Sequence, residues 1–135
     1  MVDVQIPYWP RDVQKEIHAG MDAHRFSVIV AHRRLGKTVS CVNQLEKKAV
    51  FCKKPRPRFA YIAPFYSQAK EIAWDYLKHY TKPIPNIKVN ESELWIKVPS
   101  ASGDEARIKL YGADRPDSLR GIYLDGCVID EVAQC

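Results

Sequence analysis

One stretch of eight residues limits the possible folds of this chain more than any other: residues 31–38, AHRRLGKT. An apolar run at residues 26–30 precedes it and predicts a strand, and a helical pattern follows it. A loop between a strand and a helix directs backbone N–H groups toward one point, where the helix dipole adds positive potential. Gly36 allows close backbone approach, Lys37 can reach the β- and γ-phosphates, and the Thr38 hydroxyl can ligate Mg²⁺. Residues 31–38 are therefore predicted to be a phosphate-binding P-loop, or Walker A motif.

The match to the consensus GxxxxGK[ST] is imperfect, because Ala31 occupies the position of the first glycine. On this stretch alone, a chance Gly-Lys-Thr at an ordinary helix start is the alternative. A second motif near the other end of the chain argues against chance: an apolar strand runs into Asp130-Glu131, the Walker B pattern at about residues 126–131. Asp130 can hold Mg²⁺ beside Thr38, and Glu131 can polarise a water in line with the γ-phosphate. The two motifs together predict an ATP site.

Bulk composition sets wider limits. The 135 residues and 15.5 kDa suit one domain, and the net charge of +5 permits an acidic partner such as nucleic acid without requiring one. We expect no membrane span, since no apolar run approaches about 18 residues. The four cysteines form no C-x-x-C pair, so a reducing cytoplasm is expected.

The order of predicted elements indicates an α/β fold. Helical patterns at residues 10–24 and after residue 38 flank the first strand, and a second strand at residues 59–63 precedes the clearest amphipathic helix. Alternating residues within 83–99 predict an antiparallel hairpin, followed by strands at 106–111 and 127–129. The basic run 53–58 is either a nucleic-acid contact or a solvated loop. The apolar side chains expected to bury the amphipathic helix are Phe65, Ala69, Ile72, Ala73, Tyr76, Leu77 and Tyr80.

Gln14 stands in the first predicted helix, in the pattern Pro-x-x-x-Gln upstream of the loop. In many nucleic-acid-dependent ATPases this element reads the adenine edge, and a glutamine amide offers the donor and the acceptor that adenine requires. A solvated glutamine on the helix surface is the equally weighted alternative.

Residues 111–121 (YGADRPDSLRG), followed by residues 127–134 (CVIDEVAQ), resemble the ATPase domain of tailed-phage terminase large subunits. The arginine-containing loop at 31–38 without its first glycine agrees, and the resemblance runs from about residue 7 to the end of the chain. It implies a P-loop NTPase fold of the ASCE, RecA/helicase-like class, with three layers and a mostly parallel sheet. It also implies a motor that uses ATP and Mg²⁺ to push double-stranded DNA into the procapsid. Such a motor works in the host cytoplasm as a homo-oligomeric ring with the portal protein and the small terminase subunit.

The resemblance also assigns arginines. Arg33 or Arg34 matches the loop arginine that senses the γ-phosphate, and Arg120 matches an arginine that reaches the nucleotide of the neighbouring subunit. A surface salt bridge is the alternative for Arg120. By position, Glu131 is the catalytic carboxylate.

The chain ends four residues after Glu131 (135 − 131), so we expect residues 1–135 to be the N-terminal part of an ATPase domain. The coupling motif, the lid and the nuclease domain of the family would lie downstream, and the sheet should be incomplete at its C-terminal side. Two other functions compete with a packaging motor: a helicase-like or restriction-type DNA translocase, which the Leu-Arg-Gly element disfavours, and a catalytically dead prophage remnant.

Overall fold

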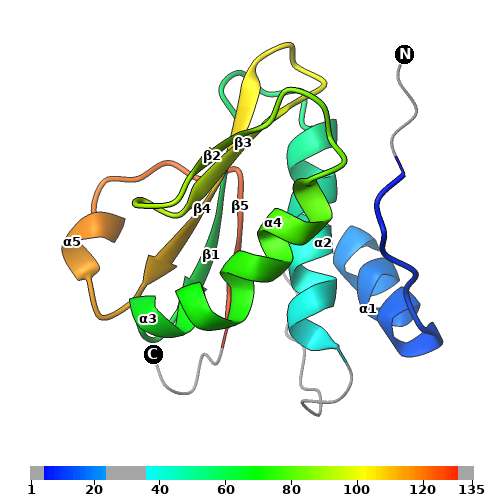
Figure 1. The fold of residues 1–135 in the computed structure, drawn as a ribbon, viewed down its shortest axis with the longest axis horizontal. Helices are drawn as coiled ribbons and strands as arrows, with labels where there is room; N and C mark the ends of the chain where they lie inside the picture. The colour runs from blue at the N-terminus through cyan, green and yellow to red at the C-terminus, as the bar shows by residue number, and fades with distance from the viewer. Residues whose placement is uncertain (1–4, 24–35, 131–135) are drawn as a thin grey trace.

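The computed structural model describes residues 5–23 and 36–130 (Figure 1). Helices α1 (Asp12–Ala23) and α2 (Lys37–Phe51) lie on either side of the first gap, and strand β1 (Arg58–Ala63) follows. The next helical stretch has three parts: α3 (Tyr66–Ala69), the π-helical turn η2 (Lys70–Trp74) and α4 (Asp75–Thr81). The remaining elements are β2 (Lys88–Asn90), β3 (Trp95–Pro99), β4 (Glu105–Gly112), α5 (Pro116–Leu119) and β5 (Gly126–Ile129).

The described strands form one sheet in the order β2-β3-β4-β1-β5. Strand β1 is parallel to both β4 and β5, whereas β3 runs antiparallel to β2 and β4. Four of the five strands therefore share one direction, which confirms the predicted α/β fold with a mostly parallel sheet. The predicted strand at residues 26–30 lies outside the described residues.

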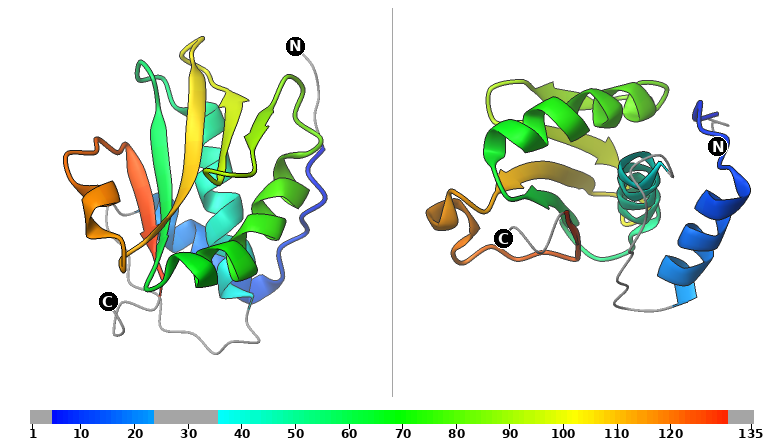
Figure 2. Two further views of the ribbon diagram at one scale, coloured as in Figure 1. Left: turned by 60° about the vertical axis from the view of Figure 1, so that its left-hand side comes forward. Right: turned by 90° about the horizontal axis from the view of Figure 1, so that it is seen from below.

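Helices α2, α3 and α4 cover one face of the sheet (Figure 2). Buried side chains from β1, β3 and β4 meet this helical layer and form the main core, because alternate residues of each strand point to it. The other face carries a smaller cluster in which the region around α5 packs on β1 and β4. Its members are Ala60, Ile62, Tyr111, Leu119, Ile122 and Leu124.

The amphipathic helix differs from its prediction. Phe65, Tyr76 and Ile72 are 50%, 42% and 38% exposed, so the expectation that they are core residues is wrong. Phe65 precedes α3 in an extended conformation and lies outside the helix. The turn η2 widens the helix at residues 70–74, and a π-helical turn takes up an extra residue and so rotates the face that carries Tyr76. The side chains that pack on the sheet are Ala69, Ala73, Trp74 and Leu77.

The parallel pairing decides where the functional groups gather. Strands β1, β4 and β5 all end at the same edge of the sheet, and the amino end of α2 lies at that edge as well (Figure 1). The backbone N–H of Asp130 donates to the carbonyl of Ile62 at 2.8 Å, which extends the pairing of β5 with β1 by one residue. Asp130 is therefore held at the carboxyl edge.

Candidate functional site

The two halves of the predicted site meet at this edge of the sheet. The Nζ atom of Lys37, the first residue of α2, lies 3.5 Å from Oδ1 of Asp130. The Lys37 side chain is 30% exposed and that of Asp130 is 12% exposed. The pair is thus partly shielded from water, where its attraction is stronger than on an open surface, yet the lysine can be reached by a ligand.

Tyr61 is a third member of the site, and the sequence analysis did not identify it. Its hydroxyl donates to Oδ2 of Asp130 at 2.5 Å. Burial raises the pKa of Tyr61 far above its ordinary value of 10.0, the Asp130 carboxylate raises it further, and the Thr38 side chain opposes the rise. The only sequence signal was a polar oxygen in the otherwise apolar centre of β1.

Gly36 is the N-cap residue of α2 and lies in the left-handed region, with φ 70° and ψ 34°. A Cβ atom at this position would lie 2.3 Å from Nε2 of Gln14, so any other residue would displace the glutamine. The carbonyl of Gly36 accepts hydrogen bonds from Gln14 Nε2 at 3.2 Å and from the Ser40 hydroxyl at 2.9 Å. A glycine is required here for both conformation and space.

Gln14 is 6% exposed, so its interpretation as a solvated surface residue is wrong. Its Oε1 accepts from the backbone N–H of Arg11 at 2.9 Å, while its Nε2 donates to Gly36. The amide therefore joins the start of α1 to the end of the predicted phosphate loop. Reading of an adenine edge by Gln14 stays a prediction.

A polar network keeps α1 on α2 and so keeps Gln14 beside Gly36. His18 lies 2.7 Å from the Tyr8 hydroxyl through Nε2 and 2.7 Å from Gln44 Oε1 through Nδ1. Gln44 donates in turn to Asp22 at 2.8 Å. Hydrogen bonds from Lys47 and Gln44 hold the pKa of Asp22 well below its usual range.

Arg120 does not join this group of side chains. It follows α5, its side chain is 82% exposed, and within the described part of the chain its recorded ion pair is with Asp117 at 3.5 Å. This position agrees with a surface salt bridge and leaves the side chain reachable by another subunit, so the arginine-finger role stays a prediction. The other predicted site residues, Ala31, Arg33, Arg34 and Glu131, lie outside the described residues.

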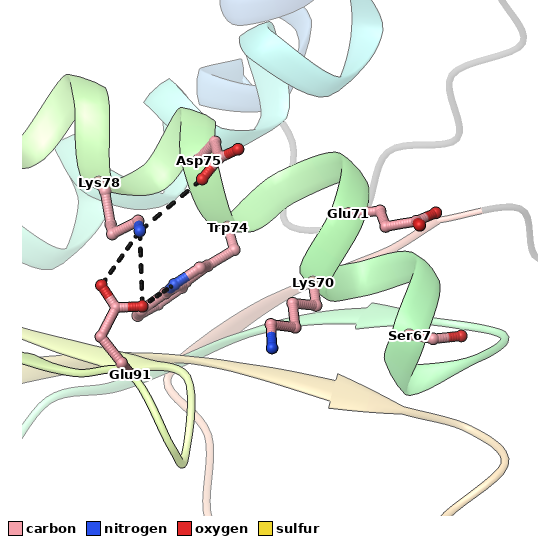
Figure 3. Close-up of a pocket in the computed structure, with 7 residues that line it drawn as sticks. All are labelled: Ser67, Lys70, Glu71, Trp74, Asp75, Lys78 and Glu91. Carbon is pink, nitrogen blue, oxygen red and sulfur yellow. Dashed lines mark hydrogen bonds and ion pairs between the residues drawn. The ribbon is translucent and has the colours of Figure 1, made fainter.

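A separate hollow of about 490 Å³ lies between the α3–η2–α4 stretch and the turn after β2 (Figure 3). Glu91 accepts a hydrogen bond from the Trp74 indole at 2.8 Å and one from Lys78 at 3.0 Å, and both bonds lower its pKa. Lys78 also lies 3.7 Å from Asp75. The ion pairs and the hydrogen bond of Glu91 fasten the turn after β2 to the helix.

Thr38 and Asp130 suit Mg²⁺. This ion keeps several waters and binds through one or two protein oxygens together with the phosphates of its substrate. A dedicated protein cage is unnecessary, and among residues 5–23 and 36–130 no three His, Cys, Asp or Glu side chains form one. In the same ranges no helix is both long and apolar enough to span a bilayer.

The fold matches solved structures of phage large terminases. The large terminase ATPase domain of Thermus phage P74-26 has a TM-score of 0.72 and 23% identity, with 96% of this chain and 56% of that domain covered. The large terminase of another phage, a thermophilic bacteriophage, in complex with ADP, has a TM-score of 0.74 and 17% identity. That match covers 92% of this chain and 32% of the ADP-bound terminase.

The chain therefore spans about half of the first of these structures and a third of the second. At such identities the likeness establishes the fold, and the predicted resemblance to terminase ATPase domains is confirmed at that level. The sequence itself matches no protein-family model and no curated protein.

Proposed function

We propose that this chain is the nucleotide-binding part of a terminase ATPase domain, which hydrolyses Mg-ATP to drive double-stranded DNA into a procapsid. The observation that carries the proposal is the meeting of Lys37 with Asp130 at the carboxyl edge of a terminase-like sheet. The ADP complex of the thermophilic phage terminase supports a nucleotide ligand. The homo-oligomeric ring, the portal protein, the small terminase subunit and the host cytoplasm belong to the same proposal.

In this proposal each residue has a defined task. Lys37 exchanges its contact with Asp130 for the β- and γ-phosphates, and the backbone that follows Gly36 supplies N–H groups at the start of α2. Thr38 and Asp130 would hold Mg²⁺, which neutralises charge that develops on the phosphates. Glu131 orients and deprotonates the attacking water, and Arg33 or Arg34 senses the γ-phosphate.

Substitution of Lys37 by alanine tests the nucleotide site. We expect the affinity for a magnesium-bound, non-hydrolysable ATP analogue to fall by about 100-fold or more, measured by titration calorimetry. The variant loses a charge-assisted hydrogen bond to phosphate and also loses the ammonium group that lies 3.5 Å from Asp130, so that carboxylate repels the incoming anion more strongly.

Lys48→Ala is the matched control, since Lys48 lies on the same helix and pairs with Asp22 away from the site. Its affinity should stay within about twofold of the parent protein, in line with the small effects of exposed ion pairs. Equal binding by Lys37→Ala and the parent would refute the proposed site.

Four cations support DNA as the partner. In the strand register, Lys88 of β2 lies opposite Lys97 of β3, which lies opposite Arg107 of β4. Arg107 in turn lies opposite Arg58 of β1. This basic row lies on the sheet face opposite the main core, because the residues alternating with it on β1, β3 and β4 are buried against the helices. Like charges directly across a ladder repel one another, and Glu105 at 3.1 Å from Lys88 offsets only part of that repulsion. A phosphate backbone would relieve the rest.

The double substitution Lys97→Gln, Arg58→Gln tests the basic row. We expect duplex DNA to bind several-fold more weakly near 0.1 M salt, and the slope of log affinity against log salt to decrease by about one for each lost phosphate contact. Fluorescence anisotropy with a short labelled duplex measures both quantities.

Lys47→Gln, Lys48→Gln removes the same charge from the helical side, where both lysines pair with Asp22. If this control lowers affinity and slope as much as the test pair, net charge alone explains the binding and the basic row is not the DNA contact.

A further inference from the structure

We propose that Tyr61 is a positioning residue of the nucleotide site, whose hydroxyl holds the Asp130 carboxylate in the orientation that accepts the metal ion of a metal–nucleotide complex. The inference rests on the proposed function and adds to it a residue that neither phosphate-binding motif contains.

The Tyr61 ring has little freedom to move. It lies in β1 between β4 and β5, opposite Leu110 on one side and Val128 on the other, and it is 2% exposed within the main core. Side chains packed at interior density keep single rotamers. The hydroxyl at the end of this ring is therefore held at a constant position relative to the sheet.

The hydroxyl determines how the Asp130 carboxylate is oriented. Oδ2 accepts the Tyr61 proton at 2.5 Å, while Oδ1 faces Lys37 at 3.5 Å, and the Asp130 backbone N–H bonds to β1. Once Lys37 binds phosphate, Oδ1 is the oxygen directed toward the ligand. Mg²⁺ demands near-ideal octahedral geometry, so a carboxylate that presents one defined oxygen binds it better than one that rotates.

The second proposed metal ligand belongs to the same meeting point. Thr38 follows Lys37 in the first turn of α2, and the Nζ atom of Lys37 lies 3.5 Å from Asp130. The Tyr61 hydroxyl therefore orients the Asp130 ligand at the place where the start of α2 and the end of β5 come together.

Tyr61→Phe removes the hydroxyl and keeps the packed ring. The probe is a fluorescent ATP analogue, titrated with MgCl₂ at constant nucleotide concentration, and titrated separately in EDTA. We expect the Mg²⁺ concentration at half-maximal binding to rise about 10-fold or more, since loss of a hydrogen bond behind a metal ligand weakens metal affinity by about 10–100-fold. Binding in EDTA, which depends on Lys37 and the loop, should change by less than about twofold.

Tyr111→Phe is the matched control. Tyr111 is 3% exposed on the neighbouring strand β4, and its hydroxyl accepts from Arg107 at 3.3 Å, away from Asp130. Its Mg²⁺ midpoint should equal that of the parent protein. An Asp130→Asn background extends the test: if Tyr61 acts through Asp130, adding Tyr61→Phe to it should shift the midpoint no further.

Three outcomes separate the inference from the proposed function. If the parent protein shows no nucleotide binding that depends on Mg²⁺, the proposed function fails. If the parent shows such binding and Tyr61→Phe has the same Mg²⁺ midpoint as the parent, the inference about Tyr61 is overturned and the proposed function stands. If Tyr61→Phe weakens binding equally with Mg²⁺ and with EDTA, the hydroxyl has only a structural role, which also overturns the inference.

Discussion

Replacement of Glu131 by glutamine is expected to slow ATP hydrolysis by about 10²–10⁴-fold, the range that a positioned general base contributes. Glutamine keeps the size and hydrogen-bonding capacity of the side chain but cannot accept the proton of the attacking water. Asp130, the preceding residue, is held to β1 by its backbone N–H and to Tyr61 by its carboxylate. The loss should therefore appear in the chemical step, with binding of the magnesium–nucleotide complex within a few-fold of the parent.

Single-turnover release of phosphate, measured with and without double-stranded DNA, gives the rate, and anisotropy of a fluorescent analogue gives the affinity. Glu71→Gln, an exposed carboxylate in η2, is the control that should keep the parent rate. A Glu131→Gln variant as fast as the parent would assign the base to another residue. A parent protein that binds nucleotide without any turnover would leave a nucleotide-binding remnant as the better account.

The second large effect concerns stability. Glu46 on α2 is 4% exposed, and its Oε2 atom has no hydrogen-bond partner within the described residues. Burial raises the pKa of Glu46 from its ordinary value of 4.5 to about 8. Because the folded-state pKa lies above the unfolded one, the contribution of this group to stability is complete below about pH 4.5 and is lost as the pH rises through 8.

We therefore expect Glu46→Gln to gain stability over the parent between pH 5 and pH 9. The free energy of unfolding of the variant minus that of the parent should rise by on the order of a few kcal/mol over this range. Urea unfolding at several pH values, followed by circular dichroism, measures the free energy of unfolding of both proteins. Glu16→Gln, at an exposed position of α1, should run parallel to the parent across the whole range. Parallel curves for Glu46→Gln as well would show that this carboxylate ionises freely in the folded protein.

Much of the fold follows from local patterns in the sequence. The apolar runs at residues 59–63 and 127–129 predicted β1 and β5, and strict alternation predicted the antiparallel strands β2 and β3, because side-chain period is a property of the strand itself. The resemblance to terminases added the class of fold, which the solved structures confirm. The set of buried side chains in the amphipathic helix was predicted wrongly in part, because no pattern in residues 65–81 predicts the π-helical turn that rotates the faces of the helix.

The candidate site divides in the same way. Lys37, Thr38 and Asp130 were predicted from the sequence because binding a phosphate and its metal would require these residue types at a strand end and a helix start. Gln14 was recognised, but its burial against Gly36 was not, since its partner is a backbone carbonyl 22 residues away. Every residue has a backbone carbonyl, so residue types alone do not identify which carbonyl a side chain will bind.

The amino-acid sequence by itself thus determined which chemical groups this protein has and which element ends carry them, because motif spacing and hydrophobic period are local. Only the tertiary structure decided which groups meet. Parallel pairing of β1 with β5 places the Tyr61 hydroxyl on Asp130, 69 residues away, and packing of α2 buries the Glu46 carboxylate. Both results depend on contacts between segments distant in the chain, and burial and register are properties of the assembled sheet and helices.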